Sequence, residues 1–136
     1  MKHSGYSGTP LSKKLGIKEN FTVSTLQVPT DYVNHLKPLP EGVNISPKLL
    51  PDSDIVHAFV HNIEELENHY PSMKKAIHKN GMVWISWPKG SSGIKTDINR
   101  DILREFVLKR GLVDVKVASY DDTYSSLKFV YRVKDR

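Results

Sequence analysis

Two short segments of the sequence combine residue types that bind anions. The first, SGYSGTP at residues 4–10, places two glycines among hydroxyl side chains ahead of a short predicted helix, LSKKLG. Backbone amides and hydroxyls at such a position can hold a phosphate group. The predicted contacts are Gly5, Tyr6, Gly8 and Thr9. A flexible lead before a helix has the same composition, so both interpretations stay open.

The second segment, Trp87-Pro88-Lys89-Gly90, follows the strongest predicted strand of the chain. The carboxyl ends of strands are where open α/β sheets bind ligands. Trp87 would supply an apolar wall, Lys89 a positive charge, and the loop GSSGIKTD a lid. This set suits a small anionic or aromatic ligand. Ordinary packing and a crossover loop explain the same residues equally well.

Two further pairs have the right chemistry but the wrong positions. Ser86 and Lys89 could be a nucleophile and its base, but Ser86 falls in a predicted buried strand and no oxyanion arrangement accompanies it. His57 and His61 lie on one face of a strand about 13 Å apart, too far to share a metal ion. We therefore predict a structural role for Ser86 and no metal site.

The segment YDDTYSS holds a pair of carboxylates, Asp121 and Asp122. Such a pair can perform acid–base chemistry or hold a cation, but in a polar hairpin aspartates most often form the turn. We predict turn formers here, and no catalytic residue is predicted elsewhere.

These segments depend on an alternation of strands and helices. Apolar runs predict strands at residues 21–26, 43–46 and 54–60. A helix then begins at Asn62, because Glu65 stands at the capping-box spacing. Pro71 predicts a kink or a break in this helix, and Gly81 predicts its end.

The second half of the chain continues this alternation. Residues 82–88 carry large side chains toward both faces, which indicates a central strand. Thr96 or Asp97 would cap the next helix, whose apolar face holds Ile98, Ile102, Phe106 and Val107. Strands at 114–118 and 127–133 should pair antiparallel, since their connection is too short for a crossover helix. The order predicts a three-layer α/β sandwich, mostly parallel, with an antiparallel C-terminal strand.

Length and composition agree with one α/β domain over residues 1–136, with a flexible N-terminal segment at 1–9. The chain has no cysteine, no apolar leader and no run approaching the roughly 20 residues that cross a bilayer, so a cytoplasmic protein is expected. The net charge of +5 permits an anionic partner. Its basic residues are scattered along the sequence, which makes nucleic acid the less favoured partner.

The segments DIVHAFV, GMVWISWPKG and RGLVDVKVASYDDTYSSLKFVYRV resemble the fourth strand, the fifth strand and the closing reversed pair of class I S-adenosylmethionine-dependent methyltransferases. The resemblance implies a Rossmann-like, methyltransferase-like fold. Those enzymes carry an acidic, glycine-rich loop after the first strand, whereas this chain reads TLQVPTDY, and its second strand VNIS lacks the acidic residue that holds the ribose. We therefore expect the fold without the cofactor.

A second resemblance covers nearly the whole chain. The segments SGYSGTPLSKKLGI, DIVHAFV, GMVWISWPKGSSGIKTDI and GLVDVKVASYDDTYSSLKFVYR are similar to a family of small uncharacterised bacterial proteins grouped as a domain of unknown function. This chain has Tyr124-Ser125-Ser126 where some members have Trp-Ser-Gly. The family implies no reaction and no catalytic residue.

The sequence therefore predicts a non-enzymatic Rossmann-like module that binds a small anionic ligand or a protein partner, with no cofactor. One alternative is a divergent transferase or nucleotide-binding enzyme that uses the N-terminal SGYSGT segment. The other is a weak nucleic-acid binder.

Overall fold

The computed structural model describes residues 9–136, which form one six-stranded mixed sheet covered by helices. The elements in chain order are α1 (Leu11–Lys14), β1 (Thr22–Leu26), α2 (Tyr32–Leu36), β2 (Asn44–Ser46), β3 (Ser53–Phe59), α3 (Ile63–Ala76), β4 (Ile77–Pro88), the 3-10 turn η1 (Gly90–Ser92), α4 (Arg100–Leu108), β5 (Leu112–Ser119), β6 (Tyr124–Tyr131) and the 3-10 turn η2 (Val133–Asp135). No helix in this part of the chain is long and apolar enough to cross a membrane.

The strand order is β2-β1-β3-β4-β6-β5. The first four strands are parallel, β6 runs antiparallel to β4, and β5 runs antiparallel to β6. The predicted centre of the sheet is confirmed, because β4 pairs with β3 on one side and β6 on the other. The predicted mostly parallel α/β sandwich with an antiparallel C-terminal strand is confirmed as well.

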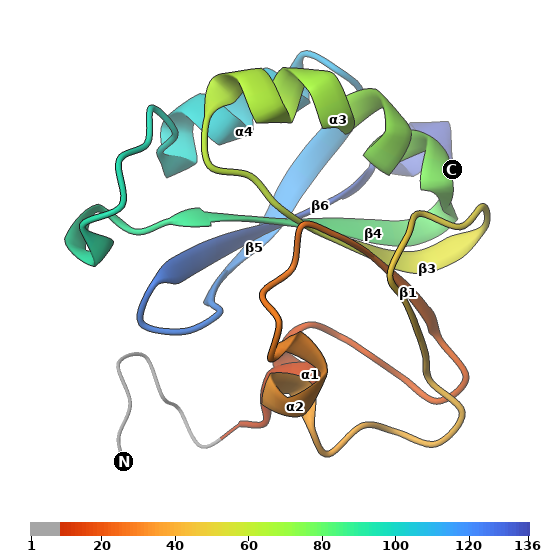
Figure 1. Cartoon of the computed structure of the whole chain (residues 1–136). Coiled ribbons are helices and arrows are strands. Elements are labelled where there is room, and N and C mark those ends of the chain that lie inside the picture. Colours follow the sequence, from red (N-terminus) through yellow and green to blue (C-terminus); the bar gives the residue numbers. More distant parts are fainter. Residues whose placement is uncertain (1–8) are drawn as a thin grey trace.

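Helices cover both faces of this sheet, which gives three layers (Figure 1). The longer helices α3 and α4 pack on one face, and the short helices α1 and α2 pack on the other. Side chains of β4 alternate between the two cores: Val83, Ile85 and Trp87 face α3 and α4, whereas Trp84 faces α1 and α2. Each face therefore has its own apolar core, as continuous apolar runs predict.

Helix α3 differs from its sequence prediction at both Pro71 and Gly81. Pro71 lies inside one continuous helix, so the predicted break is wrong, and the alternative, a kink, stays a prediction. The helix ends at Ala76, and Gly81 belongs to β4. A Cβ on Gly81 would lie 3.0 Å from the carbonyl oxygen of Ser53. Gly81 thus permits the close approach of β3 where the β3–β4 register shifts, rather than stopping a helix.

The predicted cap of α4 is also wrong. This helix begins after Asn99, whose side chain accepts a hydrogen bond of 2.9 Å from the Ile102 amide. Asp97 instead accepts a hydrogen bond of 2.8 Å from the Ile63 amide at the start of α3. Leu103 and Val107 are the buried residues of α4, whereas Ile102, predicted on the apolar face, is 42% exposed.

Candidate ligand site at the carboxyl edge of the sheet

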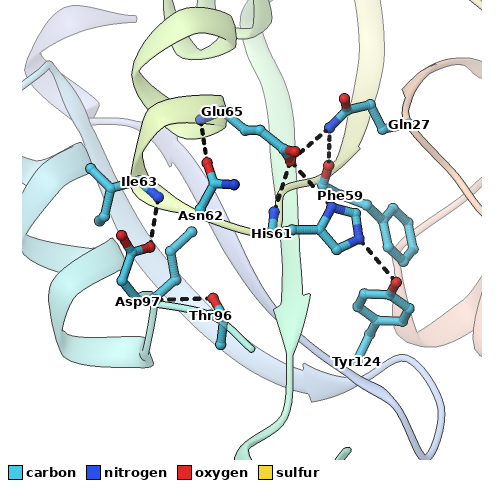
Figure 2. Close-up of polar contacts among 10 residues, drawn as sticks. Gln27, Phe59, His61, Asn62, Ile63, Glu65, Thr96, Asp97 and Tyr124 are labelled. Atoms are coloured by element: carbon cyan, nitrogen blue, oxygen red, sulfur yellow. Dashed lines mark hydrogen bonds and ion pairs between the residues drawn. The ribbon is translucent and has the colours of Figure 1, made fainter. Parts of the chain in front are cut away.

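The direction of strand addition reverses at β1. Strand β2 lies on one side of β1, and β3, the next strand in the chain, lies on the other. Open α/β sheets bind ligands outside the carboxyl ends of the strands at such a switch point. The residues that leave β1 and β3 here are Gln27 and His61, and their side chains belong to one hydrogen-bonded network (Figure 2).

Gln27 leaves β1 with a φ of 58°, in the left-handed region where glycine is favoured. A side chain in this region costs about 1–2 kcal/mol. Two hydrogen bonds hold it there: its amide nitrogen donates to the Phe59 carbonyl at 2.7 Å and to the Glu65 carboxylate at 3.1 Å. Gln27 therefore ties the end of β1 to the end of β3 and the start of α3.

Glu65 stands in the first turn of α3, where Asn62 caps the helix by accepting the Glu65 amide at 2.8 Å. One carboxylate oxygen of Glu65 accepts the His61 amide at 2.9 Å, the His61 ring at 3.2 Å and Gln27. Burial alone would raise the pKa of this carboxyl, but the hydrogen bonds from His61 and Gln27 outweigh burial and lower it. One oxygen of Glu65 is thus committed to the network.

His61 connects this carboxylate to a phenol. Its Nε2 lies 3.1 Å from the hydroxyl of Tyr124 on β6, and its side chain is 35% exposed. In the tautomer that carries its proton on Nδ1, the ring donates to Glu65 and accepts the Tyr124 hydroxyl proton at Nε2. Burial, followed by the nearby carboxylates of Asp121 and Glu65, raises the pKa of Tyr124, so the phenol stays protonated. The result is a carboxylate–imidazole–phenol series open to solvent at the imidazole.

The residues predicted to bind a ligand are distributed unevenly around this network. Lys89 lies beside it: its amide donates to the Thr123 carbonyl at 2.8 Å, and its ammonium donates to the Ser119 hydroxyl at 2.9 Å. Trp87 belongs to the core under α3 and α4 and is 6% exposed. A ligand could therefore contact only this small exposed part of the residue. Thr9 is exposed.

The predicted contacts Gly5, Tyr6 and Gly8 lie outside the described residues. The exits of β1 and β4 meet the start of β6 at this edge of the sheet. Pro88 pairs with Tyr124 at the β4–β6 boundary, and Tyr124 reaches Gln27 through His61 and Glu65.

Asp121 forms the turn, as predicted. One of its carboxylate oxygens accepts the amides of Thr123 and Tyr124, each at 2.8 Å. Sequence reasoning missed the roles of Glu65, His61 and Tyr124. The available signal was the i, i+4 spacing of His61 and Glu65 at a helix start, which the capping box alone seemed to explain.

Ser86 has the structural role that the sequence predicts. It is fully buried, and its hydroxyl contacts the His57 Nε2 at 2.7 Å and the Ser126 hydroxyl at 2.5 Å. The His57 Nδ1 lies 2.8 Å from the Tyr32 hydroxyl. Burial lowers the pKa of His57 to about 3, so this second network is uncharged. Within residues 9–136, no group of three His, Cys, Asp or Glu side chains is arranged to hold a metal ion.

Comparison with known proteins finds similar structures but no similar sequences. No protein-family model and no curated protein sequence matches the chain. A DhpI complex with SAH has 14% identity, covers 91% of this chain and 83% of its own, and has a TM-score of 0.62. Precorrin-6y C5,15-methyltransferase from Geobacter metallireducens has 13% identity, covers 88% and 84%, and has a TM-score of 0.55. Aeropyrum pernix fibrillarin with natively bound S-adenosyl-L-methionine has 14% identity, covers 83% and 67%, and has a TM-score of 0.56.

The chain therefore has the Rossmann-like fold of S-adenosylmethionine-dependent methyltransferases, as the first sequence resemblance implies. At these identities the likeness extends to the fold alone. Membership of the small bacterial family stays a prediction.

The residues at the switch point do not fit S-adenosylmethionine. The exit of β1 carries the Gln27 side chain where the methyltransferase pattern has a glycine-rich loop, and that side chain is bound to Phe59 and Glu65. At the end of β2, where the pattern places a carboxylate for the ribose, stands Ser46, whose hydroxyl is bonded to Lys48. A nucleoside would have to break the Gln27 network and would find no acid for its ribose.

Proposed function

We propose that the protein is a methyltransferase-fold module that binds a small anionic ligand at the carboxyl edge of its sheet without S-adenosylmethionine. The observation that carries this proposal is the network of Gln27, Glu65, His61 and Tyr124, whose side chains stand where the cofactor would lie. The network also determines which charges remain available to a ligand.

Three carboxylates at this edge each have one oxygen bound within the protein. Glu65 accepts three hydrogen bonds, Asp121 accepts two backbone amides, and Asp97 accepts the Ile63 amide. The Lys89 ammonium group donates to Ser119 and has two further protons that can be donated to a ligand. Its positive charge favours a carboxylate or phosphate group on the ligand.

The experiment is a thermal-shift screen with inorganic phosphate, acetyl phosphate, nucleotides, small carboxylic acids and S-adenosylmethionine. An anion present at 100 times its dissociation constant adds about 2.7 kcal/mol of stability. The variant Lys89→Ala should lose most of this stabilisation, and the loss should shrink at high salt. The matched control Lys95→Ala removes an exposed lysine from the neighbouring loop and should leave the stabilisation intact.

Two outcomes would contradict the proposal. One is saturable binding of S-adenosylmethionine by calorimetry that is lost in Gln27→Ala. The other is equal anion stabilisation in the parent and in Lys89→Ala.

A second candidate, a proton-transfer enzyme, is favoured by the series Glu65–His61–Tyr124. A carboxylate that orients a histidine, which in turn contacts a hydroxyl, is an arrangement that enzymes use to move protons. Its natural substrates would be anions with an acidic C–H bond, such as 2-oxo acids. Exchange of the pyruvate methyl protons in deuterium oxide, followed by proton NMR, should then be faster than in buffer and should fall to the buffer rate in Tyr124→Phe. Exchange at the buffer rate in the parent protein would remove this candidate.

A further inference from the structure

The opposite, amino-terminal edge of the sheet gathers basic residues that are far apart in the sequence. Lys74 and Lys75 lie in the last turn of α3, Lys79 lies near the start of β4, and Arg110 follows α4. The Lys74 ammonium lies 5.7 Å from the ring centre of Tyr131 at the end of β6, and Arg132 donates to the Leu108 carbonyl, so Arg132 comes to the same edge. Scattered charges of the sequence thus form one cluster in the fold.

This cluster surrounds a hollow of about 520 Å³, the basic pocket, between α3, the end of α4 and β6. Its lining residues are Tyr70, Pro71, Lys74, Lys75, Arg110 and Tyr131. Three of the six are cations and none is a carboxylate. An anion entering the pocket would therefore meet only positive charge on apolar walls.

Rings and a carbonyl group position three cations of this cluster. The Lys79 ammonium lies 4.3 Å from the centre of the Tyr131 ring, and that of Lys74 lies 5.7 Å from it. The Arg110 guanidinium stacks 3.6 Å from the Phe106 ring centre and donates to the Phe106 carbonyl at 2.9 Å. Among the described residues, no ion pair joins Lys74, Lys75, Lys79 or Arg110 to a carboxylate. These four cations therefore have no ion-pair partner among the described residues.

We propose that the basic pocket binds the phosphodiester backbone of single-stranded nucleic acid. Cations without an ion-pair partner at a hollow suit phosphate groups, whose counterions are released on binding. A flexible single strand can turn one phosphate and its sugar into the hollow, whereas a duplex presents a stiff convex backbone. Tyr70 and Tyr131 are 3% and 9% exposed, so their faces are not free to stack on bases. Binding therefore depends on salt and is independent of base sequence.

The site is separate from the ligand site of the proposed function, because the two lie at opposite edges of the sheet. If the anion screen at Lys89 fails, the proposal for the basic pocket still stands. If the basic pocket does not bind nucleic acid, the result of the anion screen is unaffected.

The experiment measures the fluorescence anisotropy of a labelled oligothymidine of about 12 nucleotides, within the site sizes of single-strand binders, over a series of salt concentrations. The double variant Lys75→Gln with Lys79→Gln removes two exposed cations of the cluster. The control Lys13→Gln with Lys48→Gln removes two exposed lysines elsewhere, so the net charge of the two proteins is equal.

We expect the slope of log K against log salt to become shallower by about 1.4 in the pocket variant, since each lost phosphate contact removes about 0.7. The control should keep the parental slope, and circular dichroism should show both variants folded. An equal loss in both variants would overturn the proposal, because net charge alone would then explain binding. So would absence of binding by the parent, or equal binding of phosphatidylserine vesicles or polyglutamate.

Discussion

Two histidines four residues apart, His57 and His61, use both ring nitrogens in hydrogen bonds, yet their surroundings are opposite. His57 is fully buried between the hydroxyls of Tyr32 and Ser86. His61 is 35% exposed and lies between the Glu65 carboxylate and the Tyr124 hydroxyl. One histidine therefore belongs to a closed neutral network and the other to an open network that contains a charge.

The comparison shows which feature separates a structural histidine from a candidate functional one. The groups that contact His57 are Tyr32, Ser86, Phe59 and Tyr120, none of which carries a charge at neutral pH. Burial without a compensating carboxylate makes protonation unfavourable. His61, in contrast, lies against the Glu65 carboxylate and reaches solvent. Of these two histidines, only the second contacts both a charged group and solvent.

Removing the buried ring should have the largest effect. His57→Ala leaves a cavity and strands the hydroxyls of Tyr32 and Ser86, which should reduce the free energy of unfolding by about 3–5 kcal/mol. His61→Ala should cost about 1 kcal/mol or less, because water can replace the contacts of a partly exposed ring. Urea denaturation of the two variants measures both values. Similar losses in the two would mean that the contrast drawn from burial is wrong.

Lowering the pH should also distinguish the two histidines, with a smaller effect on the free energy of unfolding. The pKa of His57 is lowered by burial from 6.5 to about 3 in the folded protein. Because the folded-state pKa lies below the unfolded one, the stability present above pH 6.5 is lost as the pH falls toward 3, by up to about 1.4 kcal/mol per pH unit for this proton.

Urea denaturation between pH 6.5 and about 5, above the range where carboxylates titrate, isolates this effect. The free energy of unfolding of His57→Gln should decline less steeply with falling pH than that of the parent. The difference in slope should correspond to the binding of one proton. His61→Gln provides the matched control and should keep most of the parental decline. A parental slope in His57→Gln would show that another group controls acid sensitivity.

The sequence predicts the fold well because residues 54–60 and 82–88 are nearly continuous apolar runs, which only strands covered on both faces require. It misplaces Gly81 because a glycine after an apolar helical pattern resembles a helix stop. The real constraint on Gly81, the nearby backbone of β3, exists only after the strands have paired.

The candidate sites follow the same division. Tyr124 is 63 residues from His61 in the chain, and the pairing of β6 with β4 brings them together. The basic pocket likewise joins α3 and β6 with Arg110, which follows α4, although no short segment of the sequence holds all its cations. Local patterns thus predict elements, whereas both sites depend on how distant elements pair.

The smallest changes in unfolding free energy are expected on removing single phenol hydroxyls. Comparing the two phenols distinguishes a structural hydroxyl from one in the candidate site. Tyr32→Phe leaves the Nδ1 of His57 without a partner in a buried position, which should cost about 1–3 kcal/mol of unfolding free energy. Tyr124→Phe removes the partner of an exposed ring, so water takes its place and the cost should stay below about 0.5 kcal/mol. Thermal and urea denaturation of both variants give these values. In the double variant of Tyr32→Phe and His57→Gln, the two losses of unfolding free energy should not add, because the two side chains belong to one network. Equal costs for the two phenylalanine variants would place Tyr124 in the fold rather than in the site. With the expected difference, the Tyr124 hydroxyl contributes little to stability, and its contact with His61 is then free to serve a ligand.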